Sequence, residues 1–354
     1  MVFETEIITV SDNKIKVAVV GCGRISAKHF EAIHEHRHDL DLVAVCDTDE
    51  QAFVNLGIDV PFYDSIDKLI ANQPVDLISL CTPSGLHPSQ AILSAQHGIH
   101  VITEKPMATR WSDGLAMIRA FDLAKKKLFV IKQNRLNPTV QILKKAIDNH
   151  LFGRIYTIQS NVLWARPQSY YDQAKWRGTW EFDGGALMNQ ASHYVDLLEW
   201  LGGAVESVQA MMSTQARLIE VEDTAVINLK WRRGTLGSMC VSMLTYPRNL
   251  EGSITILGEK GSAKLSGVAL NKFEIWEFED KGVSSIDEVN QSNYDTESVY
   301  GNGHIPYYEN VVDTLRGKAQ AIADGREGLR SLELLIACYR SAQENRAIHL
   351  PLEL

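Results

Sequence analysis

The sequence feature that most constrains the fold is a glycine-rich turn directly behind a short apolar run. Residues 17–20 form the run, and the turn is Gly21-Cys22-Gly23-Arg24-Ile25-Ser26, followed by an amphipathic stretch to about His36. The first glycine permits a tight turn, and the second lets the backbone approach a pyrophosphate at a helix N-terminus. Ser26 stands where a third glycine is usual. This order predicts the opening β-α unit of a dinucleotide-binding domain.

Further apolar runs at residues 42–46, 77–80, 101–103 and 128–131 alternate with amphipathic stretches. Runs that are buried on both faces and separated by helices are typical of a parallel sheet. We therefore expect an α/β fold whose N-terminal domain, residues 14–150, is a Rossmann-type, doubly wound parallel sheet.

Asp47 follows the second apolar run, at the expected end of a strand. A carboxylate there accepts hydrogen bonds from the ribose hydroxyls of an adenosine and repels a 2′-phosphate, which favours NAD over NADP. The alternative is an aspartate that only caps the next turn.

Two polar clusters follow the third and fourth runs. One spans residues 81–88 and contains Thr82, Pro83 and His87, and the other is Glu104-Lys105-Pro106. Ligands of open α/β sheets bind at the carboxyl ends of the strands, so we expect Glu104 and Lys105 beside the nicotinamide. Seen without its neighbours, Lys105 would be taken for a solvated surface lysine. Pro106 makes a cis peptide bond worth considering.

Beyond about Gly153 the hydrophobic period changes. Residues 155–163, 205–215, 224–230, 236–244 and 253–257 alternate or are rich in β-branched side chains. Successive strands with few helices predict a second, α+β domain, residues 151–354, on a large, mostly antiparallel open sheet with one exposed face. A leucine-rich helix at residues 328–345 is expected to pack back on the first domain.

One predicted helix, residues 184–200, interrupts these strands and carries Asn189 and His193. The two residues are four apart and are expected to share a face, with Asp183 capping the helix. A histidine on a half-buried helix is more often structural than catalytic. The strand-end lysine of the cofactor domain strengthens the case for catalysis.

Residues 164–180 combine aromatic and cationic side chains, among them Arg166, Tyr170 and Arg177. Aromatic rings stack on sugars or bases, and arginine forks bind carboxylate or phosphate, so this stretch fits a large anionic ligand. Packing of the tryptophans beneath the sheet is the alternative. Further along, His304 and Tyr307 are candidates either for lining a substrate pocket or for packing.

Length and charge exclude other classes. A chain of 354 residues is long enough for two domains, and a net charge of -9 argues against nucleic acid or anionic membrane as a partner. The start does not resemble a signal peptide, no apolar run reaches about 20 residues, and five scattered cysteines suit reduced thiols, so we expect a cytoplasmic protein. The alternating His34, His36 and His38 are expected to be solvated, and no metal site is predicted.

The chain resembles the glucose-fructose oxidoreductase and inositol dehydrogenase (Gfo/Idh/MocA) family over nearly its whole length. Three motifs that occur in this order carry the resemblance: Gly21-Cys-Gly-Arg-Ile, the Cys81-Thr-Pro stretch with His87, and Glu104-Lys105-Pro106. The resemblance implies NAD as cofactor, Glu104 at the nicotinamide ribose, and Lys105 at the reacting hydroxyl. The residues expected to contact the cofactor are Gly21, Gly23, Arg24, Ile25, Asp47, Thr82, Pro83, His87, Glu104, Lys105 and Gln133.

Members of this family usually place an aspartate and a histidine four apart on the second-domain helix, with the histidine at the reacting hydroxyl. Here Asn189 stands where the aspartate is usual, and asparagine cannot relay a proton. Lys105 and His193 are therefore the expected catalytic pair, and the sequence does not choose which accepts the proton. The residues expected to contact substrate are Arg166, Tyr170, Arg177, Asn189 and His193.

Residues 132–137, 176–191, 221–224 and 250–258 resemble one subgroup, the UDP-N-acetylglucosaminuronate 3-dehydrogenases of bacterial surface-polysaccharide synthesis. This implies oxidation of the sugar 3-hydroxyl in the synthesis of diaminated uronic acids, and a tetramer with sheets packed face to face. Two alternatives stay open. A family dehydrogenase of a free polyol would make little use of residues 164–180, and a non-catalytic NAD sensor would not need both Lys105 and His193.

Overall fold

The computed structural model describes residues 14–280, 286–296 and 299–352. The chain divides into two compact units. Of the described residues, 14–131 and 304–329 belong to the first unit, and those within 132–303 and 330–352 to the second. The domain boundary expected near residue 150 stays a prediction.

The first unit is built on a six-stranded sheet in the order β3-β2-β1-β4-β5-β6, with every pair parallel. Its apolar strands are nearly all fully buried because helices flank the sheet. The strand order reverses between β1 and β4, where ligands of such sheets bind, so the Rossmann-type prediction is confirmed. The strands are β1 (Ile15–Val20), β2 (Leu40–Cys46), β3 (Phe62–Tyr63), β4 (Leu77–Leu80), β5 (His100–Thr103) and β6 (Leu128–Val130).

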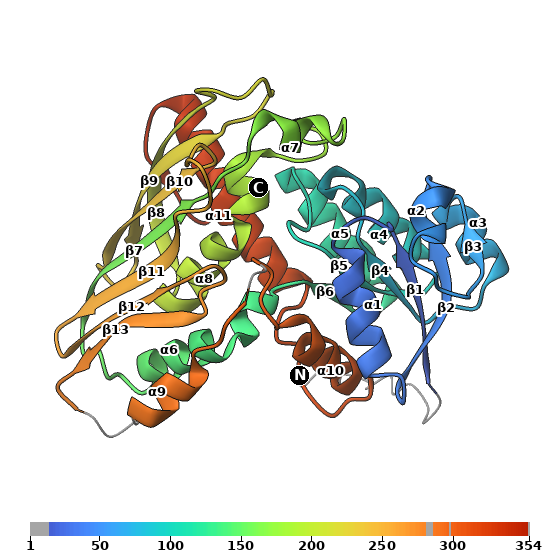
Figure 1. Cartoon of the computed structure of the whole chain (residues 1–354), viewed down its shortest axis with the longest axis horizontal. Helices are drawn as coiled ribbons and strands as arrows, with labels where there is room; N and C mark the ends of the chain where they lie inside the picture. The colour runs from blue at the N-terminus through green and yellow to red at the C-terminus, as the bar shows by residue number, and fades with distance from the viewer. Residues whose placement is uncertain (1–13, 281–285, 297–298, 353–354) are drawn as a thin grey trace. The chain divides into compact units, whose positions relative to one another are not determined.

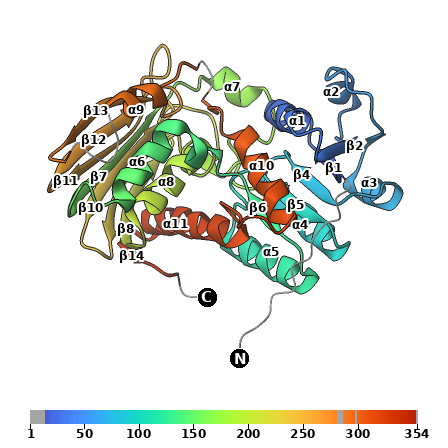
Figure 2. The same cartoon turned by 90° about the horizontal axis from the view of Figure 1, so that it is seen from below.

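Helices flank this sheet on two sides. α1 packs against α10, and α4 packs against α5. Figure 2 shows α1 on one side of the sheet and α4 and α5 on the other. The helices are α1 (Ser26–Glu35), α2 (Glu50–Val54), α3 (Ile66–Asn72), α4 (His87–Gln96), α5 (Trp111–Ala124) and α10 (His304–Leu315), with a 3-10 turn, η1, at Ser84–Leu86.

The second unit is built on an eight-stranded sheet in the order β13-β12-β11-β7-β10-β9-β8-β14 (Figure 1). Among the strands that the structure describes in this sheet, only β10 and β7 pair in parallel, so the mostly antiparallel prediction is confirmed. Burial alternates along β9, which gives the sheet one buried and one exposed face. The strands are β7 (Ile155–Leu163), β8 (Val205–Ser213), β9 (Thr224–Trp231), β10 (Leu236–Ser242), β11 (Glu251–Gly258), β12 (Gly261–Ser266), β13 (Lys272–Phe278) and β14 (Ile348–His349).

Helices cover one face of this second sheet. Figures 1 and 2 both show α6 and α8 on the same side of it. The helices are α6 (Pro138–Asp148), α7 (Gln168–Asp172), α8 (Ser192–Gly202), α9 (Ile286–Ser292) and α11 (Gly325–Glu344), with a 3-10 turn, η2, at Gln133–Leu136. The first five residues of α11 belong to the first unit and the rest to the second. A Cβ at Gly328 would lie 2.4 Å from Val130, so glycine allows this close approach to β6.

The single helix expected over residues 184–200 is wrong. A π-helical turn, η3 (Ala186–Gln190), follows Gly184 and Gly185, whose φ angles are 83° and 101°, and α8 begins separately at Ser192. Asn189 and His193 therefore do not share the face of one regular helix. Two glycines with positive φ provide an entry that a regular helix does not use.

Candidate active site

The glycine-rich turn has the features of a dinucleotide-binding turn. Gly21 has a φ of 98°, and a Cβ there would lie 2.7 Å from the carbonyl carbon of Cys81, so this position requires glycine. A Cβ at Gly23 would meet nothing within 4 Å. Asp47 accepts the backbone N–H of Cys22 at 2.5 Å, which places its carboxylate against the turn. Exposed backbone beside a strand-end carboxylate fits a pyrophosphate followed by a ribose.

His87 joins two loops at the carboxyl edge of the first sheet. Its Nε2 lies 2.9 Å from the carbonyl oxygen of Thr82, and its Nδ1 lies 2.9 Å from that of Pro106. Both partners are carbonyl oxygens, which only accept, so the two hydrogen bonds together require an N–H on each ring nitrogen. Burial lowers the pKa of His87, against the two backbone hydrogen bonds that raise it. The Thr82 hydroxyl donates to Gln90 at 2.6 Å. The structure thus places His87 inside the loop as a brace, while its expected contact with the cofactor stays a prediction.

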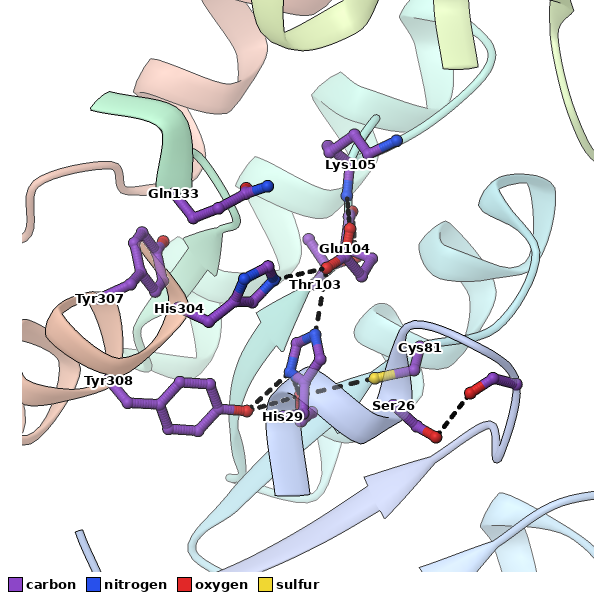
Figure 3. A network of polar contacts seen from close by, with 12 residues as sticks. Ser26, His29, Cys81, Thr103, Glu104, Lys105, Gln133, His304, Tyr307 and Tyr308 are labelled. Atoms are coloured by element: carbon purple, nitrogen blue, oxygen red, sulfur yellow. Dashed lines mark hydrogen bonds and ion pairs between the residues drawn. The ribbon is translucent and has the colours of Figure 1, made fainter. Parts of the chain in front are cut away.

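Glu104 lies at the centre of a buried polar cluster in the first unit (Figure 3). His29 Nε2 lies 3.1 Å from one carboxylate oxygen, and His304 Nε2 lies 3.5 Å from the same oxygen. On its other side, His29 Nδ1 lies 2.8 Å from both the Tyr308 and Ser79 hydroxyls. Two histidines from helices far apart in the sequence therefore converge on one carboxylate.

This cluster holds an ion pair. Burial alone would raise the pKa of Glu104, but the hydrogen bond and the charge of His29 outweigh it and hold that pKa well below its usual range. Burial would lower the pKa of His29, but Cys81, Tyr308 and Glu104 raise it well above its ordinary value. Burial lowers the pKa of His304. The charged partners are therefore Glu104 and His29, with His304 neutral.

The same three side chains are of the types that bind metals. Their ligand atoms lie within 4.8 Å of one another. Two histidines and a carboxylate are a ligand set that zinc uses, although metal-bound atoms lie about 2 Å from the ion. The direct hydrogen bond between His29 and Glu104 accounts for this grouping without an ion.

Lys105 follows Glu104 directly and is positioned by it. The second carboxylate oxygen of Glu104 accepts the backbone N–H of Lys105 at 3.1 Å. The peptide bond from Lys105 to Pro106 is cis. Figure 3 shows the Lys105 side chain extending away from the histidines. The buried ion pair and His87 therefore fix the backbone on both sides of the candidate catalytic lysine.

In the second unit, His193 and Gln133 lie side by side. The Gln133 side-chain amide nitrogen is 3.0 Å from His193 Nε2, and both residues are buried. The structure places Gln133 against the candidate catalytic histidine of its own unit, and its expected contact with the cofactor stays a prediction. His193 stands in the first turn of α8.

A buried ionic cluster anchors this pair. Asp196, three residues beyond His193, accepts two hydrogen bonds from Arg135 at 2.7 and 2.8 Å and one from Ser331 at 2.7 Å. Lys132 Nζ lies 3.4 Å away. Burial would raise the pKa of Asp196, but Lys132 and Arg135 hold it well below its usual range. The turn that carries Gln133 is thereby tied to α8.

Asn189 is held by a second carboxylate. Its amide nitrogen donates to Asp183, which also accepts the backbone N–H of Gly178 at 2.7 Å. The expectation that Asp183 caps the helix is wrong, because η3 and α8 have no side-chain cap and Asp183 binds the preceding loop instead. Position 189 therefore has no carboxylate of its own, but the carboxylate of Asp183 is hydrogen-bonded to its side chain.

The expected substrate residues Arg166, Tyr170 and Arg177 lie together. The guanidinium carbon of Arg177 is 4.1 Å from the ring centre of Tyr170, and that of Arg166 is 5.3 Å from it. Trp164 and Trp176 contribute further rings at 5.2 Å from Arg166 and 4.8 Å from Arg177. Two cations around an aromatic ring give a local positive site on an acidic protein.

The residues that support these groups were not predicted from the sequence: His29, Tyr308, and Asp196 with its two cations. Their partners lie far away along the chain: Glu104, for example, comes 75 positions after His29. His304, expected at a substrate pocket or in packing, lies against Glu104. Tyr307 donates to the carbonyl of Val130 at 2.7 Å.

Comparisons with known proteins place this geometry in a family. Residues 15–132 match the NAD-binding Rossmann fold of an oxidoreductase family, and residues 144–351 match its C-terminal alpha/beta domain. The WlbA dehydrogenase from Chromobacterium violaceum, solved with NADH and UDP-GlcNAcA, is 54% identical, covers 98% of this chain and 99% of its own, and has a TM-score of 0.93.

The WlbA dehydrogenase from Bordetella pertussis, solved with the same two ligands, is 53% identical over 97% of this chain and 100% of its own, again with a TM-score of 0.93. A D-glucoside 3-dehydrogenase of Escherichia coli is 23% identical over 96% of this chain and 99% of its own. No helix in the described part of the chain is long and apolar enough to cross a membrane. The chain belongs to the Gfo/Idh/MocA oxidoreductase family and is an NAD-dependent dehydrogenase.

Proposed function

We propose that the protein oxidises the 3-hydroxyl of UDP-N-acetylglucosaminuronate to the 3-keto sugar. The observation that carries this proposal is the 54% identity, over nearly the whole chain, to a dehydrogenase solved with NADH and UDP-GlcNAcA. The Arg166, Tyr170 and Arg177 cluster supports it, because the substrate has a carboxylate, a diphosphate and a planar base.

Each unit contributes one group for the acid–base chemistry. Lys105 stands at the end of β5 in the first unit, and His193 at the start of α8 in the second. One of these two residues accepts the proton of the sugar hydroxyl, because Asn189 offers no carboxylate that could accept or relay it. Bound NAD supplies the acceptor for the hydride. Gly21, Gly23 and Asp47 are the residues that would hold it.

Supporting residues fix the orientation of these groups. The Glu104 carboxylate holds the Lys105 backbone, and Gln133 contacts His193 Nε2. Asn189 donates to Asp183 through its amide nitrogen, which turns its side-chain oxygen away from Asp183 as a hydrogen-bond acceptor. In this scheme Asn189 binds substrate and takes no proton.

The wider setting is also a proposal. By its resemblance to the UDP-sugar enzymes, the protein would act as a cytoplasmic homotetramer, and its 3-keto product would go to a transaminase in surface-polysaccharide synthesis. The other two candidates make different predictions. A polyol dehydrogenase would turn over free inositol, and an NAD sensor would turn over neither compound.

The test is turnover by the purified protein with NAD. UDP-N-acetylglucosaminuronate is the substrate, and free inositol and UDP-N-acetylglucosamine are the comparison arms. A 2-oxo acid is added in parallel so that tightly held NADH can be reoxidised. We expect a product lighter by two hydrogens from the uronate alone. Turnover of inositol in its place, or of nothing, would contradict the proposal.

Separate substitutions test the two acid–base residues. Lys105→Met and His193→Asn are each expected to lower kcat by at least about a hundredfold, because positioned proton transfer contributes about 10²–10⁴ in rate. Exposed Lys68→Met and His97→Asn serve as matched controls and are expected to keep wild-type rates. If one of the two active-site variants keeps full activity, the other residue is the proton acceptor.

A further inference from the structure

Another buried carboxyl group, that of Glu222, lies directly behind the turn that carries Asn189. Its Oε1 accepts the backbone N–H of Leu187 at 2.8 Å, and its backbone carbonyl accepts the N–H of Ala186 at 3.2 Å. Both donors belong to the π-turn η3. Glu222 is 4% exposed and stands just before β9. One residue thus binds the start of the π-turn through both its side chain and its backbone.

The hydrogen bonds around Tyr339 indicate the charge state of Glu222. The Tyr339 hydroxyl oxygen lies 2.5 Å from the carbonyl oxygen of Gly184 and 2.8 Å from Glu222 Oε1, and it accepts the N–H of Met188 at 3.1 Å. The hydroxyl has one hydrogen, while a carbonyl and an ionised carboxylate only accept. If Glu222 were ionised, one of the two short oxygen–oxygen contacts would lack a hydrogen.

A protonated Glu222 removes this conflict. Its O–H donates to Tyr339, and Tyr339 donates to Gly184, so each short contact has its own hydrogen. The hydroxyl of Tyr339 then makes one donated and two accepted hydrogen bonds. Glu222 Oε2 has no hydrogen-bond partner among the described residues, which costs less for a neutral acid than for a buried anion.

The surroundings of Glu222 also favour the neutral form. Burial raises the pKa of Glu222 to about 7 against the hydrogen bonds of Leu187 and Tyr339, and the neighbouring Asp183 adds to the rise. The titratable groups that face Glu222 are Asp183, from the preceding loop, and Tyr339, from α11. Neither is a cation. A Cβ at Gly185 would lie 2.1 Å from Glu222 Oε2, so the carboxyl group is enclosed on that side by backbone.

We propose that Glu222 is a protonated positioning residue that holds the π-turn Ala186–Gln190, and that its deprotonation loosens this turn and weakens substrate binding at alkaline pH. The effect on substrate binding rests on the function proposed above, whereas the protonation of Glu222 does not depend on it.

The sign of the pH effect follows from linkage. A carboxyl group whose pKa is higher in the folded than in the unfolded chain binds the proton more tightly when folded. Its contribution to stability is complete below the unfolded pKa, about 4.3, and is lost as pH rises through the folded value of about 7. Between about pH 6 and pH 8.5 the protein should therefore become easier to unfold.

Thermal unfolding at these two pH values tests the proton. The wild type is expected to lose about 2 °C more in Tm between them than Glu222→Gln, which cannot titrate. Glu220→Gln is the matched control, since Glu220 is exposed two residues away and should keep the wild-type loss. Equal losses in the wild type and Glu222→Gln would overturn the proposal.

A second measurement needs no variant. In wild-type protein labelled with ¹³C at the glutamate carboxyls, one resonance is expected to titrate with a midpoint of about 7. If every glutamate titrates near its ordinary value of about 4.3, the proposal is wrong. This result decides the question even if Glu222→Gln does not fold.

The positioning role is tested by KM for UDP-N-acetylglucosaminuronate. Between the two pH values, KM is expected to rise at least about threefold more in the wild type than in Glu222→Gln. Equal rises would remove the positioning role. If the wild type turns over no nucleotide sugar, the proposed function fails, while the unfolding and NMR results still decide whether Glu222 carries the proton.

Discussion

Asp196 and Glu222 lie in the same unit and are about equally buried, yet they differ in charge. Asp196 is surrounded by Lys132, Arg135 and the Ser331 hydroxyl, and its pKa lies well below the usual range. Glu222 has Tyr339 and a backbone N–H as partners and Asp183 as its charged neighbour, and its pKa lies above the usual range. Burial by itself raises the pKa of both carboxyl groups. The cations decide which acid is ionised.

The largest effect is expected from Asp196→Ala. Removing this carboxylate leaves Lys132 and Arg135 buried without their anion, which should cost about 3–5 kcal/mol of unfolding free energy. Urea unfolding of the wild type and the variant measures the difference. A loss below about 1 kcal/mol would mean that Lys132 and Arg135 are stable in the buried state without an anion, and that the cations do not explain the low pKa of Asp196.

A smaller effect is expected from His29→Gln in the first unit. The substitution removes the charged partner of Glu104, and a hydrogen bond to a charged group contributes about 1.5–3 kcal/mol. The folded pKa of Glu104 lies below its unfolded value, so this stabilisation is present above about pH 4 and is lost as pH falls through the folded pKa. Acid unfolding curves should therefore fall less steeply in the variant. Equal slopes would show that His304 alone holds the anion.

The smallest effect is expected from Lys230→Ala on the exposed face of the second sheet. Lys230 Nζ lies 2.7 Å from Glu206, but both side chains are substantially exposed. Such pairs contribute about 0–1 kcal/mol, and less at high salt. Urea unfolding at low and high salt provides the measurement. A loss as large as that of Asp196→Ala would show that burial is not what separates strong from weak pairs here.

The sequence predicts features that depend on neighbours along the chain. The glycine-rich turn, the strand-end positions of Asp47 and Lys105, and both sheet types follow from local periodicity and turn chemistry. The group of Arg166, Tyr170 and Arg177 is also local, because a short loop and one helical turn connect these residues.

Features that depend on distant partners are not predictable in this way. Asp196 accepts a hydrogen bond from Ser331, which comes 135 positions later in the chain. The periodicity of α8 gives no sign that the Asp196 carboxylate binds Arg135 of the turn η2. The prediction that Asn189 and His193 share one helix face is wrong, because residue spacing alone cannot distinguish one regular helix from a π-turn followed by a new helix. The sequence signal for this break is the Gly184-Gly185 pair, whose φ angles are both positive.

The close contact between Gly185 and Glu222 has an evolutionary consequence. A side chain at position 185 would occupy the space of the Glu222 carboxyl group, and a shorter residue at position 222 would open that space. Gly185 also has a φ of 101°, a backbone conformation that favours glycine whatever the space around it. Among homologues we therefore expect position 185 to remain glycine even where position 222 varies, so that variation at this contact is one-sided.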